Sequence, residues 1–209
     1  PAKIKININK WIYAELLEAK SKVEKNITDY RFDEAARNIY QFVWHSYCDW
    51  YLELSKTILY SNDKASIKEV RDVSGYIFKE ILALDPQNTP ALVNYARLKN
   101  ILLDFKNSIN LYENALKLIK NDLGIWLNLG SVYQSIGEFS KANNIFNNIL
   151  KGKPSFVPAH ISISKVNDYS ENSSNLSLML DLNKSHYLNK KENSDLEFAI
   201  GKAYDDQRK

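Results

Sequence analysis

The sequence is poor in the residues and patterns that mark several large classes of protein. Its single cysteine, Cys48, cannot form an internal disulfide, which favours a reducing, cytoplasmic environment. No apolar run approaches the roughly 20 residues that cross a bilayer, so we expect no membrane partner. We also expect no secretory signal, since no basic start precedes an apolar stretch. The chain begins at Pro1 and its only methionine is Met179, which favours a fragment or a processed chain.

Glycine, proline and charge of one sign are scarce as well. The 209 residues include six glycines and five prolines, and β-branched residues nowhere alternate for long. This composition favours helix along most of the chain. The formal net charge is only +3, so strong non-specific binding to nucleic acid is not implied. We therefore predict an all-α fold in one or two domains.

The stretch before the Asp-Pro pair at 85–86 predicts three amphipathic helices. In residues 10–27, apolar side chains recur at steps of three and four, which is the period of one helix face. A later helix is predicted to start at Asn62 or Asp63, whose side chains can accept hydrogen bonds from free backbone amides. The Asp-Pro pair should end this helix, because proline disfavours helix at the residue before it.

Between these two helices we predict one long helix, capped by Asp33 and continuing to about Tyr60. Its apolar stripe, read at steps of three and four, comprises Ala36, Ile39, Val43, Tyr47, Trp50, Leu54 and Ile58.

Aromatic side chains are concentrated in this predicted helix. Nine of them occur between Tyr30 and Tyr60, which is more than one small helix face can bury. Trp44, Trp50 and Tyr51 could stack on bases, but Trp50 lies on the apolar stripe and packing is favoured there. Trp44 lies off the stripe and is the better candidate for contact with RNA or with a further domain that is missing from this chain.

An internal repeat follows. Residues 92–116 align with residues 126–150 at a constant offset, which pairs Ala96 with Gly130 and Tyr112 with Phe146. Small residues at the first pair would let two helices approach closely, and large residues at the second would fill the space beside them. The offset equals the length of the tetratricopeptide repeat, a helix-turn-helix unit that this sequence resembles. This resemblance implies a right-handed solenoid of helix pairs.

The predicted organisation is a short helical bundle over residues 1–80 and a repeat region over 81–209. The repeat units lie near residues 89–122, 123–156 and 157–190, followed by a partial unit. The third unit is degenerate, because Asn167 falls where a large apolar residue is expected and residues 170–175 are typical of a polar loop. LEFAIGKAY at 196–204 restores the pattern without its partner helix.

Three motifs in the first region carry a second resemblance. KWI at 10–12, RFDEAARNIYQFVW at 31–44 and CDWYLELSK at 48–56 resemble the anticodon-binding helical domain of class I aminoacyl-tRNA synthetases, most of all the valyl type. The resemblance covers about residues 8–79 and implies tRNA as a partner. The candidate RNA-contact residues are Lys20, Lys22, Lys25, Arg31, Arg37 and Trp44.

We expect no catalysis from this chain. The two ATP motifs that the synthetase resemblance would bring, His-x-Gly-His and Lys-Met-Ser-Lys-Ser, do not occur in it. His45 and Cys48 have a spacing seen in metal sites, but zinc needs about four ligands and no second pair exists. Asp49 and Glu53 favour a charged helix surface over acid–base chemistry. The expectation is therefore no catalytic residue, no metal and no cofactor.

The tetratricopeptide resemblance implies an inner groove that holds an extended peptide, with asparagines bonding to the peptide backbone. An amide suits this role because it both donates and accepts hydrogen bonds. Ser162 occupies the third such position, so the row of asparagines is short. The candidate groove residues are Asn94, Arg97, Asn100, Leu127, Asn128, Ser131, Gln134 and Lys165.

Three functional interpretations follow from these patterns. The leading one is a non-catalytic binding protein in which helices that contact the tRNA anticodon arm are fused to a protein-interaction repeat. The second is a fragment of a valine-tRNA ligase, which would carry the name of ligase by inheritance only. The third is a pure repeat scaffold whose N-terminal helices form a cap. The change between the two resemblances, near residues 74–81, is either a real gene fusion or an artefact of assembly.

Overall fold

The computed structural model describes residues 4–166, 169, 174–185 and 188–208. Among these residues the regular structure is helical and no strand occurs, which confirms the all-α prediction. The chain divides into two compact units, Pro1–Leu102 and Leu103–Lys209. The predicted change of sequence family near residue 80 lies inside the first unit and stays a prediction.

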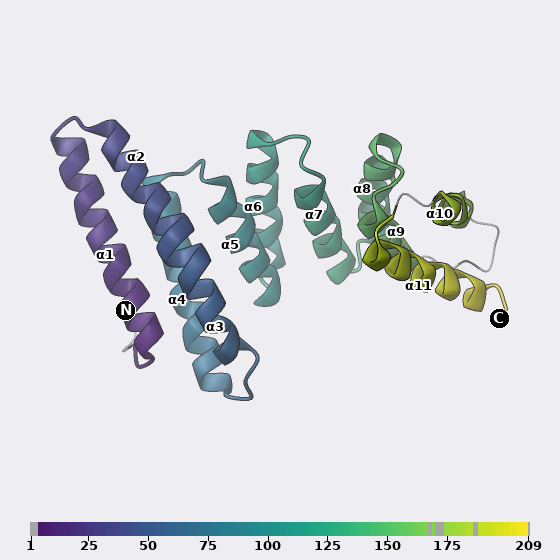
Figure 1. Cartoon of the computed structure of the whole chain (residues 1–209), viewed down its shortest axis with the longest axis horizontal. Helices are drawn as coiled ribbons and strands as arrows, with labels where there is room; N and C mark the ends of the chain where they lie inside the picture. The colour runs from purple at the N-terminus through teal and green to yellow at the C-terminus, as the bar shows by residue number, and fades with distance from the viewer. Residues whose placement is uncertain (1–3, 167–168, 170–173, 186–187, 209) are drawn as a thin grey trace. The chain divides into compact units, whose positions relative to one another are not determined.

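The first unit is a bundle built from a helical hairpin and two further helices (Figure 1). Helix α1 packs against α2, against the segment after α2 and against α4, and α4 also packs against α3 and α5. Segments α2, η1 and α3 follow one another without a break, as predicted for one long helix. The elements are α1 (Asn7–Thr28), α2 (Phe32–Gln41), η1 (Phe42–Tyr51), α3 (Leu52–Leu59), α4 (Lys64–Leu84) and α5 (Thr89–Ile101).

Two helix ends agree with the sequence and one does not. The carboxylate of Asp63 caps α4 by accepting hydrogen bonds from the amides of Ala65 and Ser66, at 3.0 and 3.2 Å. Helix α4 ends at Leu84, directly before the Asp-Pro pair. Asp33, by contrast, does not cap α2, because the helix already begins at Phe32 and no side chain caps it. A carboxylate in the first turn still suits the positive end of the helix dipole.

Segment η1 is a π-helix, and this changes which side chains face the core. The amide of Leu52 donates to the carbonyl of Tyr47, five residues back, where an α-helix uses the carbonyl four residues back. The wider turn brings Tyr51 and Ser55 to the core, and both are fully buried. The predicted stripe is therefore wrong at Trp50 and Leu54, which are 53% and 51% exposed. It is also wrong at Ala36 of α2, which is exposed while Ala35 is buried.

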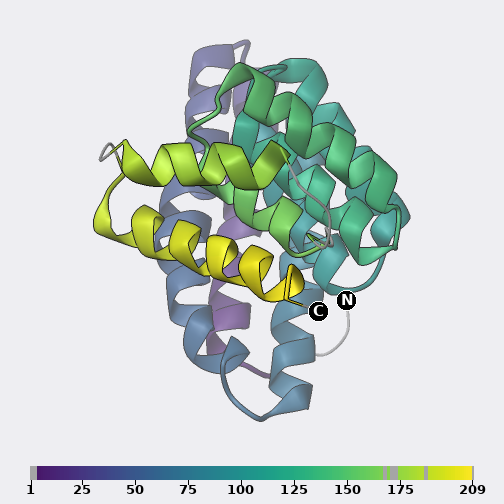
Figure 2. The ribbon, with the colours of Figure 1, turned by 90° about the vertical axis from the view of Figure 1, so that its right-hand side faces the viewer.

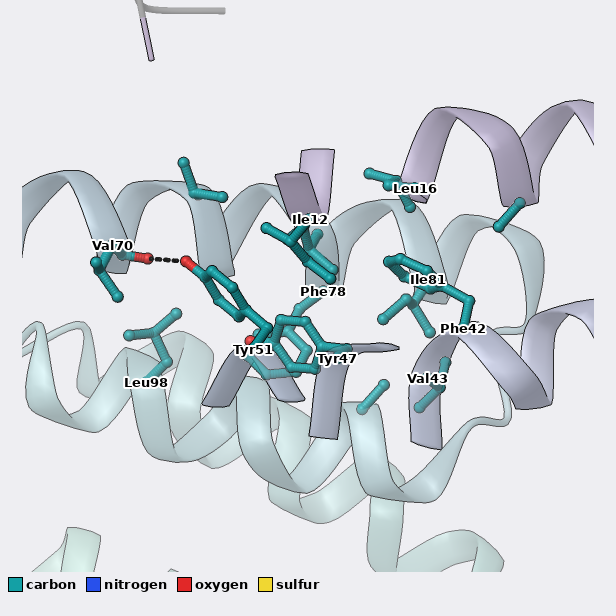
Figure 3. Packing of buried hydrophobic residues seen from close by; sticks show 14 residues of the cluster. Ile12, Leu16, Phe42, Val43, Tyr47, Tyr51, Val70, Phe78, Ile81 and Leu98 are labelled. Atoms are coloured by element: carbon teal, nitrogen blue, oxygen red, sulfur yellow. Dashed lines mark hydrogen bonds between the residues drawn. The ribbon is translucent and has the colours of Figure 1, made fainter. Parts of the chain in front are cut away.

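The core of the first unit centres on the two tyrosines of η1 (Figure 3). The rings of Tyr47 and Tyr51 stack with centroids 5.4 Å apart, and Phe78 meets Tyr47 edge-on at 5.0 Å. The Tyr51 hydroxyl donates to Asn9 Oδ1 at 2.8 Å and lies 3.4 Å from the carbonyl oxygen of Val70. Helices α1, η1 and α4 are thus joined by aromatic packing and by one buried hydrogen-bonded tyrosine.

The start of α1 is fastened to α4 by a single carboxylate. Glu69 Oε1 accepts hydrogen bonds from the amides of Lys5 and Ile6 and from the Asn9 side chain, at 3.1, 2.9 and 3.0 Å. Burial by itself would raise the pKa of Glu69, but these hydrogen bonds lower it below its ordinary value. The Glu69 side chain is therefore charged when it holds the start of α1 against α4.

The second unit is a series of short helices in which each packs on a neighbour in the chain or on the next but one. Helix α7 packs on α6 and α8, α9 packs on α8 and α11, and α10 lies beside α11 (Figure 2). The elements are α6 (Phe105–Leu118), α7 (Leu123–Ser135), α8 (Phe139–Gly152), α9 (Val157–Ser164), α10 (Ser174–Lys184) and α11 (Lys190–Asp206).

The offset between the repeats of the sequence recurs in the backbone. The bounds of α7 are those of α5 moved by one repeat period, and the same holds for α8 and α6. Asn88 caps α5 through a hydrogen bond from the Ala91 amide, and Asp122 caps α7 in the same way. The turn that follows the first helix of each repeat contains a residue with a left-handed backbone. This residue is Leu103, at φ 60°, after α5 and Gly137, at φ 80°, after α7.

Close approach of α7 and α8 depends on Gly130. A Cβ atom added there would lie 2.4 Å from the ring of Phe146, which is fully buried. The sequence prediction that a small residue faces a large aromatic in this pair is therefore confirmed for the second unit.

The third, degenerate sequence repeat contains a buried polar network where a regular repeat would have an apolar contact. His160 Nε2 lies 2.8 Å from the carbonyl oxygen of Pro154, and the Asn175 amide donates to His160 Nδ1 at 3.0 Å. The Tyr169 hydroxyl donates to Asn175 Oδ1 at 2.7 Å. Because a carbonyl only accepts, Nε2 carries the proton and the imidazole is neutral. Burial lowers the pKa of His160, although the bond to Pro154 opposes this.

The sequence prediction of a polar loop falls mostly outside the described residues. Asn167 and residues 170–173 lie there, so the structure does not test them. Ser174 and Asn175 are described and belong to helix α10, so the prediction is wrong at these two positions.

Candidate nucleic-acid interface

Most aromatic side chains between Tyr30 and Tyr60 lie on the surface of the first unit. Three of the nine are buried, namely Phe42, Tyr47 and Tyr51. The other six are exposed by 44% to 85%: Tyr30, Phe32, Tyr40, Trp44, Trp50 and Tyr60. Single exposed apolar residues are common on soluble proteins, but a concentration of large aromatics marks a binding surface.

One row of this surface runs along α2 into η1. Arg37, Tyr40 and Trp44 follow one another at steps of three and four, so they share one helix face. The rings of Tyr40 and Trp44 lie 6.1 Å apart, and Trp44 is 44% exposed. The Arg37 guanidinium is 3.9 Å from the Asp33 carboxylate, a weak contact between exposed groups that leaves the cation accessible.

The turn between α1 and α2 presents a second pair of aromatics beside an arginine. Tyr30 has a φ of 58°, which is unusual for a non-glycine residue, and its side chain is 82% exposed. Phe32 meets it edge-on at 6.3 Å. Arg31 contacts the carboxylates of Asp29 and Glu34 at 3.1 and 3.4 Å. The Arg31 cation is therefore partly neutralised.

The three candidate lysines of α1 differ in availability. Lys20 forms an ion pair with Glu80 of α4, and this hydrogen bond raises the pKa of the ammonium group. Lys22 pairs with Glu18 at 2.7 Å on an exposed helix face. Lys25 is exposed and forms no ion pair within the described part of the chain. Lys25 is therefore the lysine best placed to contact a phosphate.

Sequence reasoning missed a second aromatic surface. Trp11 and Trp50 line a shallow cleft of about 390 Å³ together with His45 and Leu54. The His45 ring meets Trp50 edge-on at 6.4 Å. Only the π-helical turn exposes Trp50, so steps of three and four could not find this surface. The KWI motif at 10–12 was the one sequence signal for Trp11.

The chemistry of Cys48 and His45 does not point to a reactive pair. Cys48 is half-buried, and this burial raises the pKa of its thiol, which disfavours the thiolate. His45 Nδ1 lies 3.6 Å from Asp49 Oδ2 on an exposed face. Within the described ranges, no three His, Cys, Asp or Glu side chains gather as a metal site.

The groove candidates fall in both units. Asn94, Arg97 and Asn100 lie on α5 of the first unit, with Arg97 exposed. Leu127, Asn128, Ser131 and Gln134 lie on α7 of the second unit, and exposed Lys165 follows α9.

Only some of the groove candidates on α7 have side-chain polar groups that are not already bonded within the described part of the chain. The Gln134 amide donates to the carbonyl of Ser162 at 2.6 Å, and the Ser131 hydroxyl donates to the carbonyl of Leu127 at 3.0 Å. Ser162 is buried and its hydroxyl donates to the carbonyl of Pro158 at 2.9 Å. Ser162 therefore does not extend the row of asparagines, and Asn128, which is half-buried, is the strongest candidate on α7.

The class of the first region is defined by a family comparison. Residues 9–85 match the family model described as the anticodon-binding domain of tRNA ligase. These residues extend from α1 to the end of α4 and include the surface of exposed aromatics.

The similar proteins among curated sequences are valine-tRNA ligases. The ligase of Pelagibacter ubique (strain HTCC1062) is 72% identical over 81 residues, which are 39% of this chain and 9% of that protein. The ligase of Rhizobium meliloti (strain 1021) is 42% identical over 84 residues, which are 40% of this chain and 9% of that protein. The similarity thus covers only a small part of these relatives' length.

Solved structures resemble the chain over most of its length but at low sequence identity. PilW, described as a widely conserved type IV pilus biogenesis factor, has a TM-score of 0.50 and 15% identity, covering 92% of this chain and 87% of that one. A tetratricopeptide repeat protein from Parabacteroides merdae has a TM-score of 0.47 and 17% identity, covering 92% and 77%. The likeness to PilW concerns the fold alone. No helix in the described ranges has the length and hydrophobicity needed to span a bilayer.

Proposed function

We propose that this chain is a non-catalytic binding protein in which helices that contact tRNA are joined to a protein-interaction repeat. The observation that carries the proposal is the match of residues 9–85 to an anticodon-binding domain, with 72% identity to a valine-tRNA ligase. Identity at this level over a whole helical bundle is expected to preserve the surface as well as the core.

The exposed surface of the first unit supports RNA as the partner. Stacking of a base on an exposed aromatic stabilises binding by roughly 1–3 kcal/mol, and an arginine beside it supplies a phosphate contact. Arg37, Tyr40 and Trp44 offer this combination on one helix face. Lys25 and Arg31 add cations near the turn between α1 and α2. The net charge of +3 is modest, so recognition would depend on these contacts more than on total charge.

The repeat supports a protein or extended peptide as the second partner. Asn128 lies half-buried on α7, and its amide can donate to and accept from a peptide backbone. The short row of asparagines predicts modest affinity. Asn94→Ala and Asn128→Ala should abolish peptide capture and leave folding nearly intact.

The decisive experiment is fluorescence anisotropy of labelled valine tRNA against the full chain, with a second tRNA species as control and a salt titration. We expect tighter binding of valine tRNA, with affinity falling as salt rises. Trp44→Ala should weaken binding about 30-fold, the middle of the range for one stacked base. Tyr60→Ala, which removes an aromatic that is 85% exposed, is the matched control and should change little.

Two outcomes would overturn the tRNA proposal. The first is that neither tRNA binds, or that both bind equally. The second is an equal effect of Trp44→Ala and Tyr60→Ala, since the aromatic row would then contribute nothing specific.

A second candidate function is that of a piece of a valine-tRNA ligase, which the identity of the similar proteins favours. This chain spans 9% of their length, so we expect no valine-dependent exchange of ATP and pyrophosphate. Clear exchange by the purified chain would replace the binding-protein proposal with an enzymatic one.

A further inference from the structure

The first unit contains a cleft that the RNA proposal does not use. It measures about 400 Å³ and lies where η1 and α3 meet α4 and α5. This volume is within the range of sites for small ligands, about 300–1,000 Å³. Apolar side chains of α3, α4 and α5 line it: Leu52, Leu59, Val70, Phe78, Leu98 and Ile101.

The charged lining of the cleft has one sign. Arg71, Arg97 and Lys56 line it, and no aspartate or glutamate among the described residues does. Lys56 is paired with Glu53, at 2.6 Å, on the same helix. Arg71 is half-buried and Arg97 is exposed, and neither forms an ion pair in the described part of the chain. Two arginines beside an apolar floor without a counter-charge create a preference for an anion.

A buried hydroxyl adds a hydrogen-bonding group to this lining. Tyr47 is fully buried, and its hydroxyl has no hydrogen-bond partner of standard geometry among the described residues. Ser74, which also lines the cleft, influences the pKa of Tyr47 as a hydrogen-bonding neighbour, but burial is the larger effect and raises that pKa. The hydroxyl is therefore neutral.

The cleft combines residues from the two resemblances. Tyr47, Val70 and Arg71 lie within the 9–85 match, whereas Arg97 and Leu98 of α5 lie beyond it. The cleft is therefore formed only where the synthetase-like helices and the first repeat helix meet. It does not follow from the anticodon-binding helices alone.

We propose that this cleft binds a carboxylate attached to an apolar group. The apolar part would lie on Leu52, Phe78 and Leu98, and the carboxylate would accept hydrogen bonds from the guanidinium groups of Arg71 and Arg97. A planar guanidinium matches the two oxygens of a carboxylate. Two sources share this chemistry, a free apolar acid and the last residue of a peptide chain.

Isothermal titration calorimetry of the full chain with matched probes tests the proposal. The free acid is 4-phenylbutyrate, and its neutral analogue is 4-phenyl-1-butanol. The peptide is acetyl-Gly-Gly-Phe with a free carboxyl end, and its neutral analogue is the same peptide amide. We expect at least one acid to bind about tenfold more tightly than its neutral analogue, since hydrogen bonds to charged groups are the strong ones. Which acid binds identifies the source.

The double variant Arg71→Gln, Arg97→Gln separates the charge from the apolar floor. It should weaken binding of the acid about tenfold or more and leave the neutral analogue unchanged. Arg208→Gln removes an exposed arginine that follows α11 and does not line the cleft, so it is the matched control, with no effect expected. Circular dichroism of each variant checks that the helices persist.

The proposal is overturned if neither acid binds, if acid and neutral analogue bind equally, or if the double variant behaves like Arg208→Gln. None of these results depends on tRNA. If tRNA binding is disproved, the carboxylate proposal therefore still stands, and if the carboxylate proposal is disproved, the tRNA proposal still stands.

Discussion

The two units bury their largest aromatic side chains in different ways. In the second unit, Phe146 packs into space that Gly130 leaves open, and residues one period apart repeat the pattern of small and large side chains. In the first unit, Tyr47 and Tyr51 stack on each other, and a π-helical turn brings both to the same side. One core is specified by the size of side chains at a fixed spacing, and the other by a change in backbone geometry.

This difference explains where sequence patterns were reliable. The repeat period was sufficient to find the Gly130–Phe146 pair because both helices are regular. Steps of three and four failed at Trp50 because they assume an α-helix, and η1 is not one. Three predictions test whether the two cores are specified in these different ways.

The largest expected effect comes from removing the second tyrosine of η1. Tyr51→Ala should reduce the free energy of unfolding of the first unit by about 3–5 kcal/mol, because a fully buried aromatic is lost. The hydrogen bond to Asn9 is lost with it. Urea unfolding monitored by circular dichroism gives the change, and peptide-resolved hydrogen exchange assigns it to the first unit.

The neighbouring tryptophan is the control for that prediction. Trp50→Ala should change the free energy of unfolding by only about 0.5 kcal/mol, since the side chain is 53% exposed. The reverse ranking, with Trp50→Ala costing more than Tyr51→Ala, would mean that residues 42–51 form an ordinary α-helix.

Two glycines test how the second unit packs. Gly130→Ala should destabilise this unit by about 1–3 kcal/mol, because the new methyl group meets the Phe146 ring. Gly201→Ala on α11 should stabilise it by about 0.5–1 kcal/mol, since the added Cβ meets no described atom within 4 Å beyond its chain neighbours and its own helix backbone, and alanine is the better helix former. Thermal unfolding of both variants measures the contrast. Equal effects of the two substitutions would refute the role given to Gly130.

The smallest expected effect depends on pH and concerns His160. Its pKa is lowered in the folded chain, so below about 6.5, its ordinary value, the unfolded state binds more protons than the folded state. The contribution of His160 to the free energy of unfolding of the second unit should therefore be fully present above this pH and should decrease as pH falls below it. Urea unfolding at pH 7.5 and 5.5 measures the change.

His160→Gln is the control for this dependence. The variant should be less stable at both pH values, because the bond to Pro154 is disturbed. Its stability should nevertheless change less between pH 7.5 and 5.5. If the pH dependence of the variant equals that of the unchanged chain, the dependence comes from other groups.

The candidate sites were only partly accessible to sequence reasoning. The motif at 31–44 placed Arg37 and Trp44 on the surface region that the structure exposes. Lys20 was chosen for its charge, but its position opposite Glu80 is a tertiary contact between distant parts of the sequence. Ser162 matched the asparagine position by spacing, yet its hydroxyl bonds to its own helix.

The sequence by itself determined the helical class, the ends of α4 and the internal repeat, because capping, proline sterics and side-chain periodicity act over a few residues. It also carried the resemblance to anticodon-binding helices, which local motifs encode. Only the tertiary structure decided that Tyr51 faces the core while Trp50 faces out. It also decided that Arg71 and Arg97 line one cleft. Both features depend on helices that are separated along the chain and meet only in the folded structure.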